Sequence, residues 1–132
     1  MGFSEHSPIT EDEDLYRAIH PHHWSGDRPS SACFKQTGGP SVDRDGGRDE
    51  EEIFSAIDDR QGTDYGIGEL SADFCLSETE VHIEPEPLDD NKYHATIYKS
   101  EDLDTHPPTS QARKLAKHAT VYRRPEPYRE EN

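Results

Sequence analysis

The sequence has few residues of the kinds that mark secreted or membrane proteins. Its 132 residues include only two cysteines, which are too few for a disulfide-rich secreted scaffold. No apolar run approaches the ~18 residues that span a membrane, and no charged-then-apolar signal segment opens the chain. We therefore expect a cytoplasmic protein that has no membrane segment and whose two cysteines are reduced.

Basic side chains are also scarce. The chain has 14 Lys and Arg residues against 29 Asp and Glu, which gives a formal net charge of −15. Nucleic acids are bound mainly through Lys and Arg side chains that neutralise phosphates, and the basic runs here are no longer than the pairs Arg113-Lys114 and Arg123-Arg124. The composition therefore argues against a nucleic-acid partner. The locally basic segment 113–129 is the exception, suited to a phosphate or to an acidic neighbour.

Hydrophobic residues make up only 29% of the chain, which leaves two interpretations open. One is an acidic disordered chain, because low hydrophobicity with high net charge prevents a packed core. The other is a folded protein adapted to a salt-rich cytoplasm, where mobile ions screen the repulsion between surface carboxylates. Four Phe, six Tyr and one Trp favour the folded, halophile-type protein. We expect a mobile tail at residues 1–8, a single domain at 9–122 and an extended tail at 123–132.

Local patterns predict a mixture of helices and strands. Thr10 and Glu13 form the capping-box pattern of a helix start, which predicts a short helix that Pro21 ends; an extended segment 15–19 is the alternative. The remaining predicted elements are strands at 32–35, 41–43, 65–70, 81–84 and 93–98, a helical turn at 71–76, and helices at 49–60 and 109–119. Two glycines in the strand 65–70 leave room for a neighbouring backbone.

Together these elements predict an α+β fold: a small, largely antiparallel sheet of four or five strands with two or three helices on one face, which leaves at least one face open. Residues 41–43 are expected to return beside 32–35 after the turn at Gly38-Gly39-Pro40. The segments 81–84 and 93–98 are expected to pair as a hairpin with a long loop.

Residues 15–43 gather the side chains that are most characteristic of a contact surface. Arg28-Pro29-Ser30-Ser31 leads into Phe34-Lys35, and Ser41-Val42-Asp43 follows. This R-P-S-S-x-x-F-K block with S-V-D, preceded by Tyr16-Arg17 and followed by His94-Ala95, resembles a family of small uncharacterised prokaryotic proteins, here in a halophile-type acidic version. The resemblance implies a shared fold and no particular reaction.

The same stretch contains the predicted binding site. Aromatic and Arg side chains dominate the energetics of protein interfaces, so we assign Trp24, Arg28, Ser30 and Ser31 to a contact patch. The function predicted from the sequence is a non-catalytic protein-interaction or assembly module of a salt-adapted cytoplasm. The alternative that Trp24 and Phe34 belong to the core stays open.

A second, enzymatic hypothesis rests on three short elements in order. Arg17 in a Tyr-Arg pair, Ser30 in a Ser-Ser pair and Glu80 in Glu78-x-Glu80 resemble the Arg, Ser and Glu-x-Glu elements of ADP-ribosyltransferases, although the Ser-Ser pair departs from the usual Ser-Thr-Ser. The resemblance implies NAD as cofactor, with Arg17 and Ser30 positioning it and Glu80 engaging the ribose.

No metal site is assigned from the sequence. His20, His22 and His23 with Cys33 and Cys75 include the side-chain types that bind zinc. Their spacing, however, matches no paired-ligand pattern, and a solvated histidine-rich loop explains the three histidines more simply.

Overall fold

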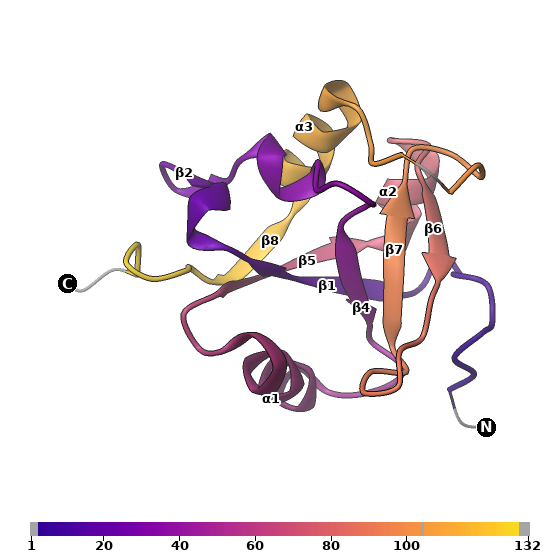
Figure 1. Cartoon of the computed structure of the whole chain (residues 1–132), viewed down its shortest axis with the longest axis horizontal. Coiled ribbons are helices and arrows are strands. Elements are labelled where there is room, and N and C mark those ends of the chain that lie inside the picture. Colours follow the sequence, from indigo (N-terminus) through magenta and orange to yellow (C-terminus); the bar gives the residue numbers. More distant parts are fainter. Residues whose placement is uncertain (1–2, 104, 130–132) are drawn as a thin grey trace.

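Six antiparallel strands form the main sheet of the protein (Figure 1), in a computed structural model that describes residues 3–103 and 105–129. Their order across the sheet is β6-β7-β4-β1-β5-β8. The strands are β1 (Asp14–Ile19), β4 (Ser41–Arg44), β5 (Gly66–Ser71), β6 (His82–Pro85), β7 (His94–Tyr98) and β8 (Thr120–Arg123). A two-stranded hairpin consists of β2 (Trp24–Ser25) and β3 (Arg28–Pro29). The predicted α+β class is confirmed, and the main sheet is larger than the four or five strands expected.

Most elements predicted after residue 43 are confirmed. The helix α1 (Glu50–Gln61) begins at Asp49 with a complete capping box, because Asp49 accepts from the Glu52 backbone and the Glu52 side chain accepts in return. The short helix α2 (Ala72–Ser77) and the helix α3 (Thr109–His118) follow. The predicted hairpin corresponds to β6 and β7, paired from His82↔Tyr98 to Pro85↔Ala95.

The helix predicted after Thr10 is wrong, and the extended alternative is confirmed. The capping-box side chains form only a turn, in which the Thr10 backbone N–H donates to Glu13 Oε2 at 2.8 Å. From Asp14 onward the chain pairs with β5 over six residues. β1 has buried residues on both of its sides. A central strand has this pattern when both faces of its sheet are covered, whereas a surface helix buries only one apolar stripe.

The strand predicted at 32–35 is also wrong. Residues Ser31–Phe34 form a 3-10 helix, η2, and a second one, η1, spans Pro21–His23. The strand predicted at 41–43 is confirmed as β4, but it pairs with β1 and β7 instead of with 32–35. Cys33 and Phe34 are buried through the helical turn, so burial alone did not require a strand there.

The helices cover both faces of the sheet, not one as the sequence suggested (Figure 1). The main core lies on the side of η2, α2 and α3 and includes Leu15 and Ile19 from β1. A second core on the α1 side is made of Tyr16, Ile53, Ile57 and Ile67, four residues from α1, β1 and β5. Among the described residues, β4, β6 and β7 add nothing to this second core, so their α1-side face stays largely polar.

Glycine in β5 permits the last strand to join the sheet. An added Cβ at Gly66 would lie 2.7 Å from the carbonyl oxygen of Arg123 and 2.7 Å from Pro125 Cδ. The predicted close approach of a backbone to this strand is therefore confirmed. The approaching segment is β8, where the sequence analysis predicted no strand.

The described segments near both chain ends pack back on the domain. The Phe3 ring lies against Tyr93 in a tilted arrangement with ring centroids 4.9 Å apart, and Arg44 Nη1 donates to the carbonyl oxygen of Ser7 at 2.8 Å. Near the other end the Glu126 backbone N–H donates to the carbonyl oxygen of Asp64 at 2.8 Å. Residues 1–2 and 130–132 of the expected tails lie outside the described part of the chain. Within that part, no helix combines the length and apolar character needed to cross a membrane.

Candidate functional site

A groove of about 580 Å³ lies between the β2–β3 hairpin and α3. We call it the basic groove. Its lining consists of Ser25, Arg28, Pro29, Ser30, Ser31, Arg113, Lys114, Ala116 and Lys117. Residues 25–31 thus face residues 113–117 across the groove, although some 80 positions separate them in the chain.

The helical repeat of α3 explains why its cations gather on one side. Ala112, Leu115 and Ala116 are buried in the main core, which leaves Arg113, Lys114 and Lys117 exposed. Positions three and four apart share a helix face, so Lys117 is a neighbour of both other cations. Such like-charged neighbours cost about 0.2–0.5 kcal/mol each, a cost that a bound anion would remove.

The opposite wall is held by Trp24 and by backbone hydrogen bonds. Trp24 is only 7% exposed, belongs to the main core, and its Nε1 donates to the Gly26 carbonyl oxygen at 2.9 Å. The Ser30 backbone N–H donates to the carbonyl of His23 at 2.9 Å. Lys35 Nζ donates to Thr109 Oγ1 at 2.8 Å and connects the end of η2 to the start of α3. The groove is therefore part of a rigid frame.

The electrostatics of the groove differ from those of the rest of the protein. Among the described residues, five other arginines form ion pairs, the shortest being Arg44 with Glu13 at 2.7 Å, Arg60 with Asp43 at 2.7 Å, and Arg123 with Asp58 at 2.6 Å. Within residues 3–103 and 105–129, by contrast, the groove cations Arg28, Arg113, Lys114 and Lys117 form no ion pair or side-chain hydrogen bond. Four exposed positive charges thus meet in the basic groove without a carboxylate partner among the described residues, although the net charge of the chain is −15.

Three of the four predicted binding residues meet in this groove. Arg28 is exposed, and Ser30 and Ser31 are half-buried along its wall. The assignment of Trp24 to an exposed contact patch is wrong, because its side chain is buried in the main core. The sequence analysis missed α3 as the second wall, although the locally basic segment 113–129 was its signal.

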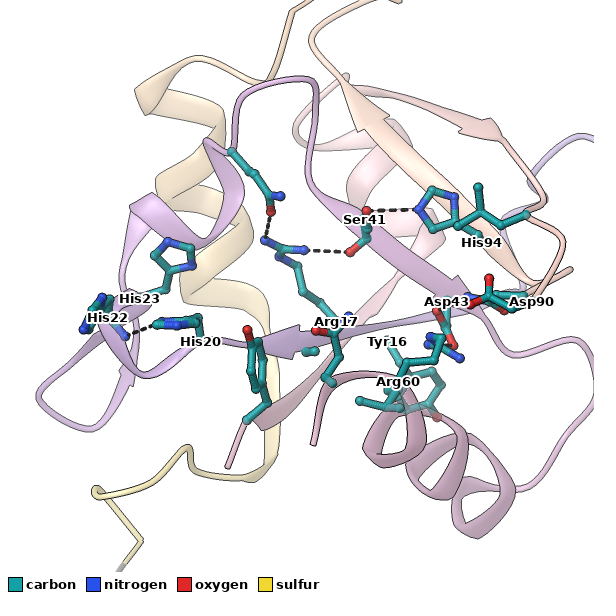
Figure 2. A pocket seen from close by; sticks show the side chains of 17 residues that line it. Tyr16, Arg17, His20, His22, His23, Ser41, Asp43, Arg60, Asp90 and His94 are labelled. Carbon is teal, nitrogen blue, oxygen red and sulfur yellow. Dashed lines mark hydrogen bonds and ion pairs between the residues drawn. The ribbon is translucent and has the colours of Figure 1, made fainter. Parts of the chain in front are cut away.

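A second opening of about 670 Å³ lies where β1 and β4 separate. We call it the central cleft; Figure 2 shows Arg17, Ser41 and His94 in its interior, with Arg60 and Tyr16 below. The two strands pair only through Leu15↔Arg44 and Tyr16↔Asp43. Its lining consists of Tyr16, Arg17, Ala18, His20, His22, His23, Gln36, Ser41, Asp43, Ile57, Arg60, Gln61, Tyr65, Leu88, Asp90, Asn91 and His94.

Arg17 replaces the missing strand pairing inside the central cleft. Its Nε donates to the Cys33 carbonyl and its Nη1 to the Ser41 carbonyl, each at 2.8 Å, and Nη2 donates to Gln36 Oε1 at 2.9 Å. A buried guanidinium needs such acceptors, and buried carbonyls need such donors. Arg17 therefore holds η2 and β4 at their distance from β1.

The histidines at one end of the cleft lie close together without the geometry of a metal site. The His20 and His22 rings are 4.7 Å apart, and the His22 backbone N–H donates to His20 Nδ1 at 3.0 Å. Burial, followed by the nearby positive charge of Arg17, lowers the pKa of His23. Among the described residues, no group of three or more His, Cys, Asp or Glu side chains is placed to hold a metal ion.

The two cysteines are free and buried. Burial raises the pKa of the Cys33 thiol and raises that of Cys75 to about 12. Since thiolates are the reactive form of cysteine, both side chains are suited to packing. They belong to the main core.

The three elements that resemble ADP-ribosyltransferases do not share a site. Arg17 lines the central cleft, Ser30 lines the basic groove, and Glu80 is an exposed residue between α2 and β6, with φ of 58°, that lines neither. ADP-ribosyl transfer with NAD therefore stays a prediction from the sequence. Comparison with protein-family models, with curated proteins and with solved structures finds no match to this chain.

Proposed function

We propose that the protein is an interaction module whose basic groove binds an acidic segment of a partner protein. The observation that carries this proposal is the convergence, on a strongly acidic chain, of four cations that have no carboxylate partner among the described residues. Structural cations on such a chain readily find carboxylate partners, as Arg44, Arg60 and Arg123 do. Cations left without one are suited to an anion supplied from outside.

The groove chemistry fits carboxylate side chains on a polypeptide. The guanidinium groups of Arg28 and Arg113 offer paired N–H donors that match a carboxylate. The hydroxyl groups of Ser30 and Ser31 add uncharged donors beside them. Pro29 and Ala116 are buried and provide an apolar floor for the chain between its acidic side chains.

The charge of the whole molecule favours a short acidic segment over a polynucleotide. A nucleic-acid strand that crosses the groove continues over a surface whose net charge is −15, and its phosphates are repelled there. An acidic segment of a few residues ends within the groove. The proposed partner is therefore a protein with a local cluster of Asp and Glu.

The proposal is tested with a fluorescently labelled tetra-glutamate peptide by anisotropy at about 0.1 M salt, where the screening length is about 10 Å. The double variant Arg113→Glu/Lys117→Glu should weaken binding at least ~10-fold, the equivalent of about 1.4 kcal/mol. The double variant Lys92→Glu/Lys99→Glu is the matched control, since it changes the net charge by the same amount and both lysines are exposed and lie outside the groove. It should change binding less than ~2-fold, because screened distant charges contribute little.

Two results would overturn the proposal. One is an equal loss of peptide binding in the groove and control variants, which would mean that the net charge of the protein, and not the groove, determines binding. The other is tighter binding of a single-stranded oligonucleotide of the same charge than of the peptide. Thermal melts of each variant confirm that the fold is retained.

A further inference from the structure

Ser41 and His94 form a hydrogen-bonded pair inside the central cleft (Figure 2). Ser41 Oγ and His94 Nε2 are 3.0 Å apart. The strand register explains the pairing: Ser41 lies opposite Thr96 and Asp43 opposite His94, so Ser41 and His94 are diagonal neighbours on one face of the sheet. Both side chains are half-buried and line the cleft.

A backbone carbonyl sets the proton arrangement of this pair. His94 Nδ1 lies 2.8 Å from the carbonyl oxygen of Glu86, and a carbonyl oxygen only accepts hydrogen bonds. Nδ1 therefore carries the proton in the neutral imidazole. Nε2 is left with its lone pair directed at Ser41, so the Ser41 hydroxyl donates to it. This is the relation of a nucleophile to a general base oriented by a third group.

The cleft supplies further N–H donors beside the Ser41 backbone. Arg17 Nη1 donates to the backbone carbonyl of Ser41 at 2.8 Å, which places the guanidinium next to this residue. Each Nη carries a second N–H, and Nη2 uses one of its two on Gln36. A positive group at this position stabilises negative charge that develops near Ser41 Oγ.

We propose that Ser41 and His94 are the nucleophile and the general base of a hydrolytic site for small, polar carboxylic esters. The cleft volume of about 670 Å³ falls in the range of small-molecule sites. Its lining of arginine, histidine and amide side chains suits a polar substrate. This inference uses the central cleft alone and does not depend on the basic groove.

The reaction uses two linked acyl transfers. Ser41 Oγ bonds to the ester carbonyl carbon while its proton passes to His94 Nε2, and the carbonyl electron pair moves to the oxygen beside Arg17. Collapse of this intermediate breaks the carbon–oxygen bond to the alcohol, which leaves with the proton from Nε2. Water then attacks the acyl-Ser41 with His94 as base, and the acid departs as Ser41 regains its proton.

The test is covalent labelling with a fluorophosphonate probe, located by peptide mass spectrometry, together with turnover of p-nitrophenyl acetate. The wild-type protein should be labelled at Ser41, and Ser41→Ala should lose both labelling and turnover. His94→Asn keeps an N–H donor near the Nδ1 position for the Glu86 carbonyl but lacks the base. It should slow labelling by ~100-fold or more, the range of general-base catalysis.

Ser55→Ala is the control, because Ser55 is an exposed hydroxyl on α1 outside the cleft. Labelling and turnover should be unchanged in this variant. Absence of labelling in the wild-type protein, or equal turnover in wild type and Ser41→Ala, would overturn the proposal and leave the Ser41–His94 bond with a purely structural role. The wild-type measurement decides this even where a variant fails to fold.

Discussion

At the scale of single residues, Asp14 lies in an unfavourable setting. Burial and the neighbouring Glu69 carboxylate raise the pKa of Asp14 to about 6 from its ordinary value of 3.8. The unfolded chain loses this proton near pH 4, whereas the folded protein keeps it until about pH 6. The Asp14 contribution to stability is therefore lost as the pH rises from about 4 to 6, and it stays lost at neutral pH.

Asp14→Asn should raise the melting temperature at pH 7 and leave it unchanged below pH 4, because the amide never ionises. Thermal melts at several pH values measure this difference, with exposed Asp27→Asn as the control for removal of one charge. A gain of equal size at low and neutral pH would contradict the assignment. So would an equal gain in the control at pH 7.

Arg28 and Phe34 separate contact from core within one short segment. Arg28 is exposed in the basic groove, whereas Phe34 is 1% exposed in the main core. Arg28→Ala should weaken acidic-peptide binding by about 1–3 kcal/mol with little change in melting temperature. Phe34→Ala should lower the free energy of unfolding by about 3–5 kcal/mol through a cavity. Chemical denaturation and anisotropy measure the two effects; comparable losses of stability would contradict the assignment.

The identity of Trp24, the single tryptophan of the chain, does not decide whether its side chain is exposed or buried. The sequence Trp24-Ser25-Gly26-Asp27-Arg28 suits an exposed contact loop as well as a hairpin that closes over its own core. Which of the two occurs depends on η2 and α3, which pack beside Trp24 in the main core. Trp24 is therefore a core residue that supports the wall of the basic groove. Arg28 is the residue of this segment that we expect to contact the partner.

At the scale of elements, local signals identified the helices α1 and α3, of which only α1 begins with a side-chain cap. Asp49 with Glu52 marks the start of α1, and the spacing of Ala112, Leu115 and Ala116 marks α3. The same kind of cap signal failed at Thr10, because the following residues pair with β5, about 50 positions away. Pairing of distant strands provides more burial there than a short helix, and no local pattern encodes it.

The joining of β8 to the sheet depends on Gly66. Gly66→Ala should destabilise the fold, because its Cβ would lie 2.7 Å from the carbonyl oxygen of Arg123, and a backbone atom cannot move aside cheaply. Gly68→Ala is the matched control: its Cβ would meet the flexible Ile19 Cδ1 at 3.1 Å. Denaturant unfolding should show the larger loss for Gly66→Ala. Equal losses would mean that reduced backbone freedom, not the approach of β8, sets the effect.

At the scale of the whole molecule, the net charge of −15 predicts that salt stabilises the fold. Raising KCl from about 0.1 M to 2 M shortens the screening length from about 10 Å to below about 3 Å, so repulsion between surface carboxylates collapses. The melting temperature followed by circular dichroism should rise steeply over this range. Binding of the acidic peptide should weaken over the same range. A melting temperature indifferent to KCl would contradict the salt-adapted interpretation.

Each candidate site is formed by residues that are far apart in the sequence and meet only in the fold. The basic groove joins Arg28 to Arg113, and the central cleft joins Ser41 to His94. Arg28, Ser30 and Ser31 were predicted because one contiguous block contains them. The Ser41–His94 pair was missed, since its only local signals are two short motifs more than 50 residues apart, and their meeting depends on the β4–β7 register.

The second core, on the α1 side, has a consequence for how the protein opens. Four buried side chains hold α1 to the sheet, two of them, Ile53 and Ile57, from the helix itself, whereas α3 packs into the much larger main core. Cooperative units with little buried apolar surface open at lower free energy than the whole domain. Backbone amides of α1 should therefore exchange with deuterium sooner than those of α3, and Ile57→Ala should accelerate exchange selectively in α1. Each such opening would bring the sheet beneath α1 into contact with solvent while the basic groove stays assembled.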